Sequence, residues 1–413
     1  MNIFDTSKRM MRILLIAFMV SSCEPVTLAS GGIGGTGISW GTIAAFGSVY
    51  VNGVHFDTDN IEEVQVNGIT YSDLSALRVG MVVRIYGSIN ADGITGTARG
   101  ILYENELTGP ISSVDDAGDT ISVLGQTVHV DGNTLYTNNA DSAVILNEAD
   151  LDPLSGTTYE IEVSGYSNGN GEIYARRIEL KDIWTDPGEV EFKGSIDTIS
   201  GNSLTIGTLT VDISAIATDL EFTPSTGMYV KVKGSYSSIT PNTVIASDVE
   251  QRELGVAGTD GEEYELEGVI TSNGGGGLIT INGQSVNVGS AQYENGDSSL
   301  LSPGTYIEVE GVFDAAGVLI ADEVEFESVG GETESVGSIS TVNSTTRTIT
   351  INGLSIYVPF TAIMKDDRET ALDEYLNMEE LSSIVQSLGN ANAEVRYYDD
   401  NGVNTATRVI LKD

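Results

Sequence analysis

The sequence predicts an all-β protein, a tandem array of about five small five-stranded, OB-like β-barrel modules with one helix in the last module. Short runs rich in Val, Ile, Thr and Tyr recur along the chain and are bounded by Gly- and Asn-bearing turns, which is the pattern of strands. The 48 glycines and 8 prolines indicate many tight turns without a collagen-like period. One segment pattern repeats about five times, which is typical of repeat architectures.

The first 22 residues have the layout of a secretory signal peptide. Lys8, Arg9 and Arg12 precede an apolar run, Ile13–Val20, and small residues follow it. The run is much shorter than the roughly 20 residues that span a bilayer. We therefore predict a signal peptide over residues 1–22 and no permanent transmembrane helix.

The only cysteine of the chain follows this segment. Val20–Cys23 resembles a bacterial lipobox, and the resemblance implies cleavage before Cys23 and acylation of its thiol. Each buried methylene contributes about 0.8 kcal/mol, so two or more acyl chains anchor a domain stably. The alternative is cleavage further on, for example after Ala29. Because Glu24 follows, the segment resembles outer-membrane lipoproteins, which face the periplasm or the cell surface. Residues 23–39 are then a lipidated cysteine and a Gly-rich tether.

Each repeat begins with a glycine and a short strand, and a hairpin follows. In Ser48–Phe56 apolar residues alternate around Asn52-Gly53. Asn-Gly is the strongest short-range hairpin signal, because both turn positions need a positive φ. The other repeats place Leu124-Gly125, Gly207-Thr208, Asn282-Gly283 and Asn352-Gly353 in the same slot. The leading glycines are Gly41, Gly109, Gly194, Gly268 and Gly337.

A connection that can hold a helical turn, such as Leu77–Gly80, precedes a long fourth strand, and a fifth strand closes each repeat. Alternation in Ile307–Glu310 and Val324–Glu327 predicts one apolar, packed face and one acidic, solvent-facing face. This order suits a small closed barrel of OB type, with a two-sheet sandwich as the alternative. The fourth strands are expected at Met81–Gly87, Tyr159–Gly165, Met228–Gly234 and Tyr306–Gly311.

The module boundaries follow from these repeats, and the last module departs from the pattern. There, apolar residues at helical spacing predict a helix near residues 368–388 that covers one barrel end. Units of this size bury only about 60 % of their unfolded surface, so neighbouring modules are expected to share apolar contacts. Lys181–Glu189 and Arg252–Glu262 are the expected hinges. The modules are expected at residues 40–106, 107–182, 189–253, 263–328 and 334–413.

These motifs resemble a bacterial family, domain of unknown function 5666, which occurs in repeated copies in exported proteins. The resemblance rests on Gly35–Ile38, Phe46–Thr58, Leu124–Val130 and the strands of the form Gly-x-x-Val-x-Val-x-Gly. It covers essentially residues 35–413, loosely in the last module. It implies the barrel-like fold and no activity.

The chain is strongly acidic, with a formal net charge of −41. Such a surface repels phosphate backbones, so we expect no nucleic-acid partner. Arg176-Arg177 is the only adjacent basic pair of the mature chain. Cationic partners and divalent metal ions are attracted, more weakly as salt rises. The alternative is that acidity keeps an exported protein soluble and strand edges apart.

Residues with catalytic or zinc-binding chemistry are scarce. The two histidines, His55 and His129, fall at matching places in their hairpins with side chains expected to face outward. With one lipidated cysteine, they supply neither a usual zinc site nor a Ser-His-Asp triad. We therefore predict no catalytic residue, no metal ligand and no cofactor. The carboxylate pairs Asp115-Asp116, Asp366-Asp367 and Asp399-Asp400 are expected at turns or loop edges.

Two further features carry the chemistry of a binding site. Asp57–Asn60 and Asn168–Glu172 offer oxygen ligands, but neither matches an EF-hand loop, so plain turns are expected and calcium stabilisation stays a hypothesis. Trp40 and Trp184 could stack on sugars, as OB barrels do bind oligosaccharides. Their positions at module junctions favour a covering role instead.

These observations predict a lipid-anchored cell-envelope protein that acts as a non-enzymatic spacer, scaffold or adhesin-like binder. Its partners would be the membrane, through the anchor, and an envelope protein or glycan; the sequence assigns neither a binding residue nor an oligomeric state. The alternative is a module that binds an envelope glycan or other ligand through barrel-end loops. One aromatic-lined pocket repeated in several modules would favour the alternative, whereas different loops without a shared pocket would favour the scaffold.

Overall fold

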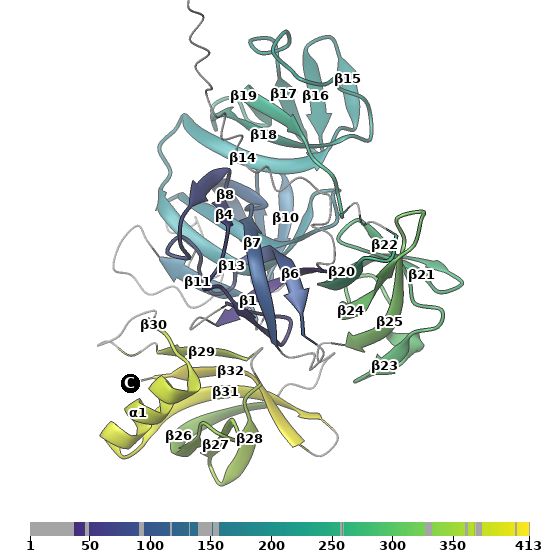
Figure 1. Ribbon diagram of the computed structural model, residues 1–413. Helices are drawn as coiled ribbons and strands as arrows, with labels where there is room; N and C mark the ends of the chain where they lie inside the picture. The colour runs from purple at the N-terminus through teal and green to yellow at the C-terminus, as the bar shows by residue number, and fades with distance from the viewer. Residues whose placement is uncertain are drawn as a thin grey trace, which may run out of the picture.

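The computed structural model of the chain (Figure 1) is almost entirely made of β-strands. It describes residues 37–45, 49–90, 95–115, 118–131, 133–138, 151, 157–256, 258, 260–326, 333–359, 362–366, 368, 374–400 and 403–412. The predicted signal peptide, Cys23 and most of the predicted tether lie outside these residues. The last predicted tether residues, 37–39, belong to the first strand.

The fourth repeat, which we call barrel 4, illustrates the module. Its strands are β20 (Glu263–Gly275), β21 (Leu278–Ile281), β22 (Gln284–Asn287), β24 (Tyr306–Phe313) and β25 (Leu319–Phe326). β20 pairs antiparallel with β21 and with β24, the hairpin strands β21 and β22 pair, and β22 pairs parallel with β25. β24 and β25 complete the ring. The expected closed, OB-like barrel is confirmed.

The same ring, in which the third and fifth strands are parallel, recurs in the other four repeats. Barrel 1 contains β1 (Gly37–Ala45), β2 (Val49–Val51), β3 (Val54–Asp57), β6 (Val82–Ile89) and β7 (Thr95–Tyr103), with β4 (Glu63–Val66) and β5 (Ile69–Tyr71) added. Barrel 2 contains β8 (Leu107–Asp115), β9 (Thr120–Val123), β10 (Gln126–His129), β12 (Tyr159–Ser167) and β13 (Glu172–Ile183), with β11 (Leu135–Asn138) added. Barrel 3 contains β14 (Gly188–Ser195) and β15 (Thr198–Ser200) as two parts of its first strand, then β16 (Ser203–Ile206), β17 (Leu209–Asp212), β18 (Tyr229–Tyr236) and β19 (Thr243–Gln251). Barrel 5 contains β26 (Thr333–Asn343), β27 (Thr348–Ile351), β28 (Leu354–Tyr357), β31 (Ala391–Asp400) and β32 (Val403–Leu411), with β29 (Ile363–Asp366) and β30 (Glu374–Tyr375) added.

The leading glycine of each repeat has a steric cause. In barrel 1 the turn residue Asn52, at φ 50°, folds back over the first strand. A Cβ on Gly41 would lie 1.6 Å from Asn52 Oδ1, so only glycine fits there. The corresponding approaches are 2.6 Å for Gly109 and Leu124, 2.4 Å for Gly194 and Ile206, 2.1 Å for Gly268 and Asn282, and 2.3 Å for Gly337 and Asn352. The glycine therefore allows the turn to pack directly against the first strand, and this contact holds the hairpin against the barrel.

The first strands also join barrels in pairs. In β1, Ile43–Ala45 pair with β2, which leaves the preceding half of that edge without its hairpin partner. There Ile38–Trp40 pair parallel with Tyr264–Leu266 of β20. Barrels 1 and 4 thereby share a 13-stranded sheet, and β8 and β14 join barrels 2 and 3 in a 12-stranded sheet. Covering a free strand edge removes a site of unwanted pairing. The modules are thus not a linear string, because barrel 1 pairs with barrel 4 (Figure 1).

Both expected hinges are held by contacts. In the first, Trp184 packs against Tyr236 with ring centroids 6.3 Å apart, and Asp186 accepts a hydrogen bond of 3.0 Å from the Ser238 amide. In the second, Arg252 donates to Glu104 at 3.1 Å. The two hinges stay a prediction, and each linker carries side chains that contact other parts of the chain.

The helix of barrel 5 is shorter than predicted. α1 spans Met378–Leu388 rather than 368–388, and Glu374–Tyr375 form the short strand β30 instead. Asn377 caps the helix by accepting from the amides of residues 379 and 380, while Glu380 bonds back to the Asn377 amide, and this capping box fixes the start. α1 packs on β26 and β31 through Met378, Leu381 and Val385. Within the part of the chain that the structure describes, no helix is long and apolar enough to cross a membrane.

Candidate functional site

Glutamates cover the outer face of three adjacent strands of barrel 4. Since side chains alternate along a strand, Leu266, Val309 and Val324 point into the core and the residues between them point outward. The outward residues stand directly opposite one another on paired strands. These pairs are Glu265 with Glu310, Glu267 with Glu308, Glu308 with Glu325, and Glu310 with Glu323. We call these six residues the glutamate face; like charges in this arrangement repel.

Three carboxylates of the glutamate face converge. Oxygens of Glu265, Glu308 and Glu310 lie within 4.8 Å of one another. Glu265 is only 3 % exposed, because the fused strand β1 covers it, and Ser39 Oγ donates to its Oε2 at 2.5 Å. Burial, with Glu310 nearby, raises the pKa of Glu265 to about 8. Burial and the neighbouring glutamates also raise the pKa values of Glu308 and Glu310.

A neutral side chain of barrel 1 reaches the same place. Asn52, the turn residue that covers Gly41, is 7 % exposed, and its Nδ2 donates to the Trp40 carbonyl at 3.3 Å. Its side chain also contacts Glu265 closely enough to lower the pKa of that carboxyl by hydrogen bonding, against the larger effect of burial. Asn52 Oδ1 is buried and accepts no hydrogen bond from the described residues.

A cavity of about 520 Å³ adjoins Glu265 and Glu310. Further carboxylates, Glu263 and Asp322, stand in its lining beside the backbone of Gly37. The cavity is therefore lined by carboxylate oxygens and their negative charge, and it has room for water.

Glu267 is the member of the face whose charge is neutralised. Arg176 Nη2 of barrel 2 lies 3.0 Å from Glu267 Oε1, and both side chains are less than a tenth exposed. The Thr42 amide donates to Oε2 at 3.0 Å. The Arg176 guanidinium also stacks 3.9 Å over the Tyr306 ring. Residues of barrels 1, 2 and 4 thus meet at one buried junction.

A second cavity, which we call the junction pocket, encloses about 280 Å³ between barrels 1, 2, 3 and 4. Arg84 stacks 4.3 Å over the Trp40 ring and donates to the Gly255 carbonyl at 3.2 Å. Burial opposes ionisation of Glu104, but Lys193, Arg252 and Lys231 outweigh it and hold the pKa of Glu104 at about 2. The pocket is balanced in charge and is assembled once from several barrels rather than repeated in each.

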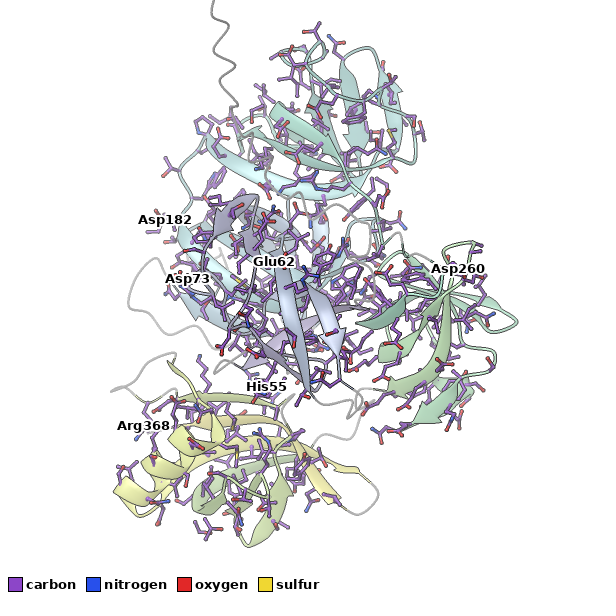
Figure 2. The ribbon with its side chains drawn as sticks, in the orientation of Figure 1. His55, Glu62, Asp73, Asp182, Asp260 and Arg368 are labelled. Carbon is purple, nitrogen blue, oxygen red and sulfur yellow. The ribbon has the colours of Figure 1, made fainter. Side chains whose placement is uncertain are left out.

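The histidines lie on separate barrels and do not form a common site. His55 stacks on Tyr50 with centroids 4.4 Å apart, and His129 stacks on Tyr174 at 4.7 Å. Both are half-buried cross-strand neighbours of their tyrosines. Figure 2 shows His55 on the side of barrel 1 that faces barrel 5. Cys23 lies outside the described residues.

The predicted carboxylate turns have structural partners. Asp57 Oδ1 accepts from the Asp59 amide at 2.8 Å, and Asn168 Oδ1 accepts from the Asn170 amide at 2.8 Å. Asp366 is buried rather than at an open turn, and Arg368 (Figure 2) pairs with it at 2.5 Å. Asp115 ends β8, and Asp399-Asp400 end β31 at its hairpin. Asp116 and Asp367 lie outside the described residues.

The remaining candidates lie inside junctions. Trp40 and Trp184 are both half-buried between barrels, as their positions in the sequence favour. Arg176 and Arg177 are each 4 % exposed and pair with Glu267 and Glu179, so they form no basic surface groove. The glutamate face was missed as a site. Its signal was the repeated Glu-x-Glu of three strands, which was interpreted as a solvent-facing surface, whereas the structure buries Glu265 and Glu267.

Three stretches of the chain match one protein family. The model described as "Domain of unknown function (DUF5666)" matches residues 108–179, 193–250 and 267–325. These stretches fall in barrels 2, 3 and 4, so the resemblance drawn from the motifs is confirmed for three copies. No curated protein matches the chain.

Proposed function

We propose that this chain, which carries repeated copies of the domain of unknown function DUF5666, is a rigid, lipid-anchored and non-enzymatic scaffold of the cell envelope. The observation that carries the proposal is the buried bonding between barrels. Besides Arg176 and Glu267, Tyr103 of barrel 1 donates to Glu162 of barrel 2 at 3.0 Å, and the Val82 amide donates to Ser164 Oγ at 2.8 Å. Barrels joined in this way would keep their spacing, which is what a scaffold requires.

Energetics support a rigid body. Breaking a buried ion pair costs about 3–5 kcal/mol, because one charge is left buried and uncompensated. Motion between barrels 2 and 4 would separate Arg176 from Glu267. Motion between barrels 1 and 4 would also break the backbone bonds of β1 and β20.

Distances between spin labels test the rigidity. The lipid-free mature chain with Cys23→Ser carries spin labels on cysteines introduced by Asn202→Cys in barrel 3 and Ser290→Cys in barrel 4, both at exposed positions. The distance between the two labels reports on the relative position of the two barrels. We expect one narrow distance distribution, and a broader one after Arg176→Met. A broad distribution in the parent protein would contradict the scaffold proposal.

The anchor is tested separately. The proposal is that Cys23 carries the lipid and that the protein is held at the outer membrane, facing the periplasm or the cell surface. Metabolic labelling with a fatty acid should mark the parent chain and not Cys23→Ser, and only the parent should sediment with membranes. Equal labelling of both chains would contradict the anchor.

The junction pocket supports a second candidate function, binding of a small polar ligand such as an envelope sugar. The pocket lining contains the ion pairs of Lys193 with Glu106 and of Arg252 with Glu104, together with Arg84. Its volume is close to the lower end of ordinary ligand sites, about 300 Å³. The pocket lies between barrels, whereas the sequence predicts binding through barrel-end loops. Saturation-transfer NMR with envelope-derived sugars should give contacts that Arg252→Ala weakens. Contacts that Arg252→Ala leaves unchanged would exclude this pocket.

A further inference from the structure

Among the described strands, the first strand of barrel 5 has an edge that is only partly paired. Barrel 5 lies at one end of the molecule (Figure 1). Its strand β26 pairs with β31 from Thr333 onward on one side, but pairing with the hairpin strand β27 on the other side begins only at Ile339. No described strand pairs with the hairpin side of residues 333–336. We call this stretch the open edge; unpaired backbone groups on such an edge allow another strand to pair with it.

The same stretch is occupied in the other four barrels, where it pairs with the first strand of a neighbouring barrel. At the position one residue before the leading glycine, Lys193 of barrel 3 and Glu267 of barrel 4 are 8 % and 5 % exposed. Val336 holds this position in barrel 5 and is 64 % exposed. An apolar side chain is thus exposed where the joined barrels bury charged ones. This contrast indicates that the open edge is one half of a join.

The join between barrels 2 and 3 shows how two such edges fit together. Leu107 of β8 and Phe192 of β14 each stand two residues before their leading glycine, and they lie opposite each other in antiparallel pairing. Beside them, Thr108 lies opposite Glu191, which joins a residue one before its glycine to a residue three before. If the other side of the join repeats this pairing, the two strands are related by a local two-fold axis.

The other side does repeat the pairing, and it adds an ion pair. The Lys193 amide donates to the Glu106 carbonyl at 3.2 Å, which again joins a residue one before its glycine to a residue three before. Lys193 Nζ also lies 2.9 Å from Glu106 Oε1. The join of barrels 1 and 4 is instead parallel and offset by one residue, since Ile38, three before its glycine, faces Tyr264, four before its own. Of the two joins, that of barrels 2 and 3 therefore has the symmetry that two identical edges need.

We propose that the open edge of barrel 5 pairs antiparallel with the same edge of a second copy of this chain, which gives a two-fold dimer. The first-strand edges of the other four barrels are already paired within the chain, so barrel 5 of another copy supplies the matching edge. In the register of barrels 2 and 3, Ser335 faces the partner's Ser335 on the axis. Val336 then faces the partner's Glu334, and this contact occurs twice in the dimer.

The charge of the chain limits the strength of this dimer. Each copy carries a formal net charge of −41, so two copies repel each other at long range. The paired stretch is also short, and small interfaces are typically weak and transient. We therefore expect micromolar association that strengthens as salt screens the repulsion. This inference goes beyond the scaffold role, and its test depends neither on the anchor nor on the spacing between barrels of one chain.

Sedimentation velocity over a series of protein concentrations tests the dimer. With the lipid-free mature chain carrying Cys23→Ser, we expect a reversible equilibrium between monomer and dimer. Val336→Glu sets like charges opposite each other twice per dimer and should weaken association by at least about tenfold. Val403→Glu is the matched control, because it makes the same change at another exposed valine of barrel 5 and should associate as the parent does. Since Val336 is exposed, Val336→Glu should leave the unfolding midpoint of the monomer unchanged.

A change to the opposite charge separates strand pairing from a general apolar contact. Val336→Lys places a lysine opposite the partner's Glu334, as Lys193 stands beside Glu106, and should keep or strengthen association. Equal weakening by Val336→Lys and Val336→Glu would overturn the proposal, and so would a dimer that Val336→Glu weakens no more than the control does. A parent chain that assembles beyond the dimer, or that stays monomeric, would overturn it as well; a monomer would leave the open edge to a strand of a different protein.

Cysteine pairs test the register without adding charge. In the Cys23→Ser background, chains with Glu334→Cys are mixed with chains with Val336→Cys under mild oxidation. Directly opposed residues have Cβ atoms about 4.5–5.5 Å apart and diagonal residues are about 7–8 Å apart. A disulfide joins Cα atoms at most about 6.8 Å apart, so the opposed pair is within reach and the diagonal pair is not. Mixed disulfides should therefore form faster than disulfides within either chain population alone, and equal rates would contradict the proposed pairing.

Discussion

Barrels 3 and 4 present the same three-strand face with opposite charges at its centre. Gly234 in β18 and Gly311 in β24 occupy equivalent positions of the fourth strand. When the two strands are aligned on these glycines, Lys231 corresponds to Glu308 and Lys233 to Glu310. In barrel 3 Lys233 stands opposite Glu191 and Asp248, whereas Lys231 stands opposite Lys193 and Glu250. Lys231 Nζ lies 2.6 Å from Oε1 of Glu191, its diagonal neighbour. In barrel 4 the same positions set carboxylate against carboxylate.

The difference separates what the fold requires from what it does not. Opposite charges across paired strands contribute roughly 0.2–1 kcal/mol each, and like charges destabilise by similar amounts. Since barrel 3 folds to the same ring with lysines on its fourth strand, the excess of glutamate in barrel 4 is not needed to build a barrel.

The two tryptophans allow each side of this comparison to be measured. Trp40 lies at the seam of barrels 1 and 4, and Trp184 packs with barrels 2 and 3. Trp184→Phe leaves Trp40 as the only reporter, and Trp40→Phe leaves Trp184.

The largest effect is expected when barrel 3 is made to resemble barrel 4. Lys231 is 2 % exposed and pairs with Glu191 and Glu104, so Lys231→Glu removes a buried cation and adds a third carboxylate. We expect a loss of about 5 kcal/mol in the free energy of unfolding. Denaturant unfolding followed by Trp184 fluorescence measures it. The exposed change Lys233→Glu is the control and should cost less; equal losses would contradict this reasoning.

The second-largest effect is expected when Arg176, the cationic partner of Glu267 in barrel 4, is replaced. Arg176→Met leaves Glu267 buried and unpaired, and we expect a loss of about 3 kcal/mol in unfolding followed by Trp40. The double variant Arg176→Met/Glu267→Met should recover most of that stability, because no buried charge remains. If the double variant is no more stable than the single one, the loss comes from packing on Tyr306 rather than from charge.

A smaller gain is expected when barrel 4 is made to resemble barrel 3. Glu310 is exposed and stands between Glu265 and Glu323, so Glu310→Lys turns two repulsive pairs into attractive ones. In chelator we expect about 1 kcal/mol more stability, with Glu310→Gln giving a part of it. A loss of stability in chelator would show that the glutamate face is not under repulsion.

The smallest effect is a difference in pH response between the two sides, measured in chelator. The pKa of Glu265 is raised, so its protonated form stabilises the fold below about pH 4.5, and that contribution is lost as the pH rises toward about 8. The pKa of Glu104 is lowered, so its contribution is present above about pH 4.5 and is lost as the pH falls toward about 2. The Trp40 midpoint should therefore fall as the pH rises from about 4.5 to 8. Both midpoints should fall as the pH drops below about 4.5, because Trp40 also lines the junction pocket with Glu104. Parallel profiles would contradict the assignment.

Much of the fold was predictable, because its causes are local. Strand alternation and Asn-Gly turns predict the hairpins. The repeated glycines mark the first strand of each module, although that strand begins two to six residues before its glycine. The start of α1 was misjudged because apolar spacing continues before Asn377, and the capping box at Asn377 and Glu380 decides the boundary instead.

The fusion of barrels and the candidate site were not predictable, because their causes are distant in sequence. A two-residue period shows which face of β20 is polar, but not that β1 covers it and buries Glu265. The Arg176-Arg177 pair gave no sign that Arg176 meets a glutamate 91 residues away. Ser39 and Asn52 are ordinary strand and turn residues until the seam places them beside a carboxylate.

The use of first-strand edges has a consequence for the number of modules. The first strands of barrels 1 and 4 pair with each other, and so do those of barrels 2 and 3. Among the described strands, β26 of barrel 5 pairs only with β27 and β31 of its own barrel. Among the five described barrels, barrel 5 is therefore the one whose first strand does not pair with another barrel. Gain or loss of a single repeat would change whether every barrel can pair with another through its first strand. Duplication of two joined barrels would leave this unchanged.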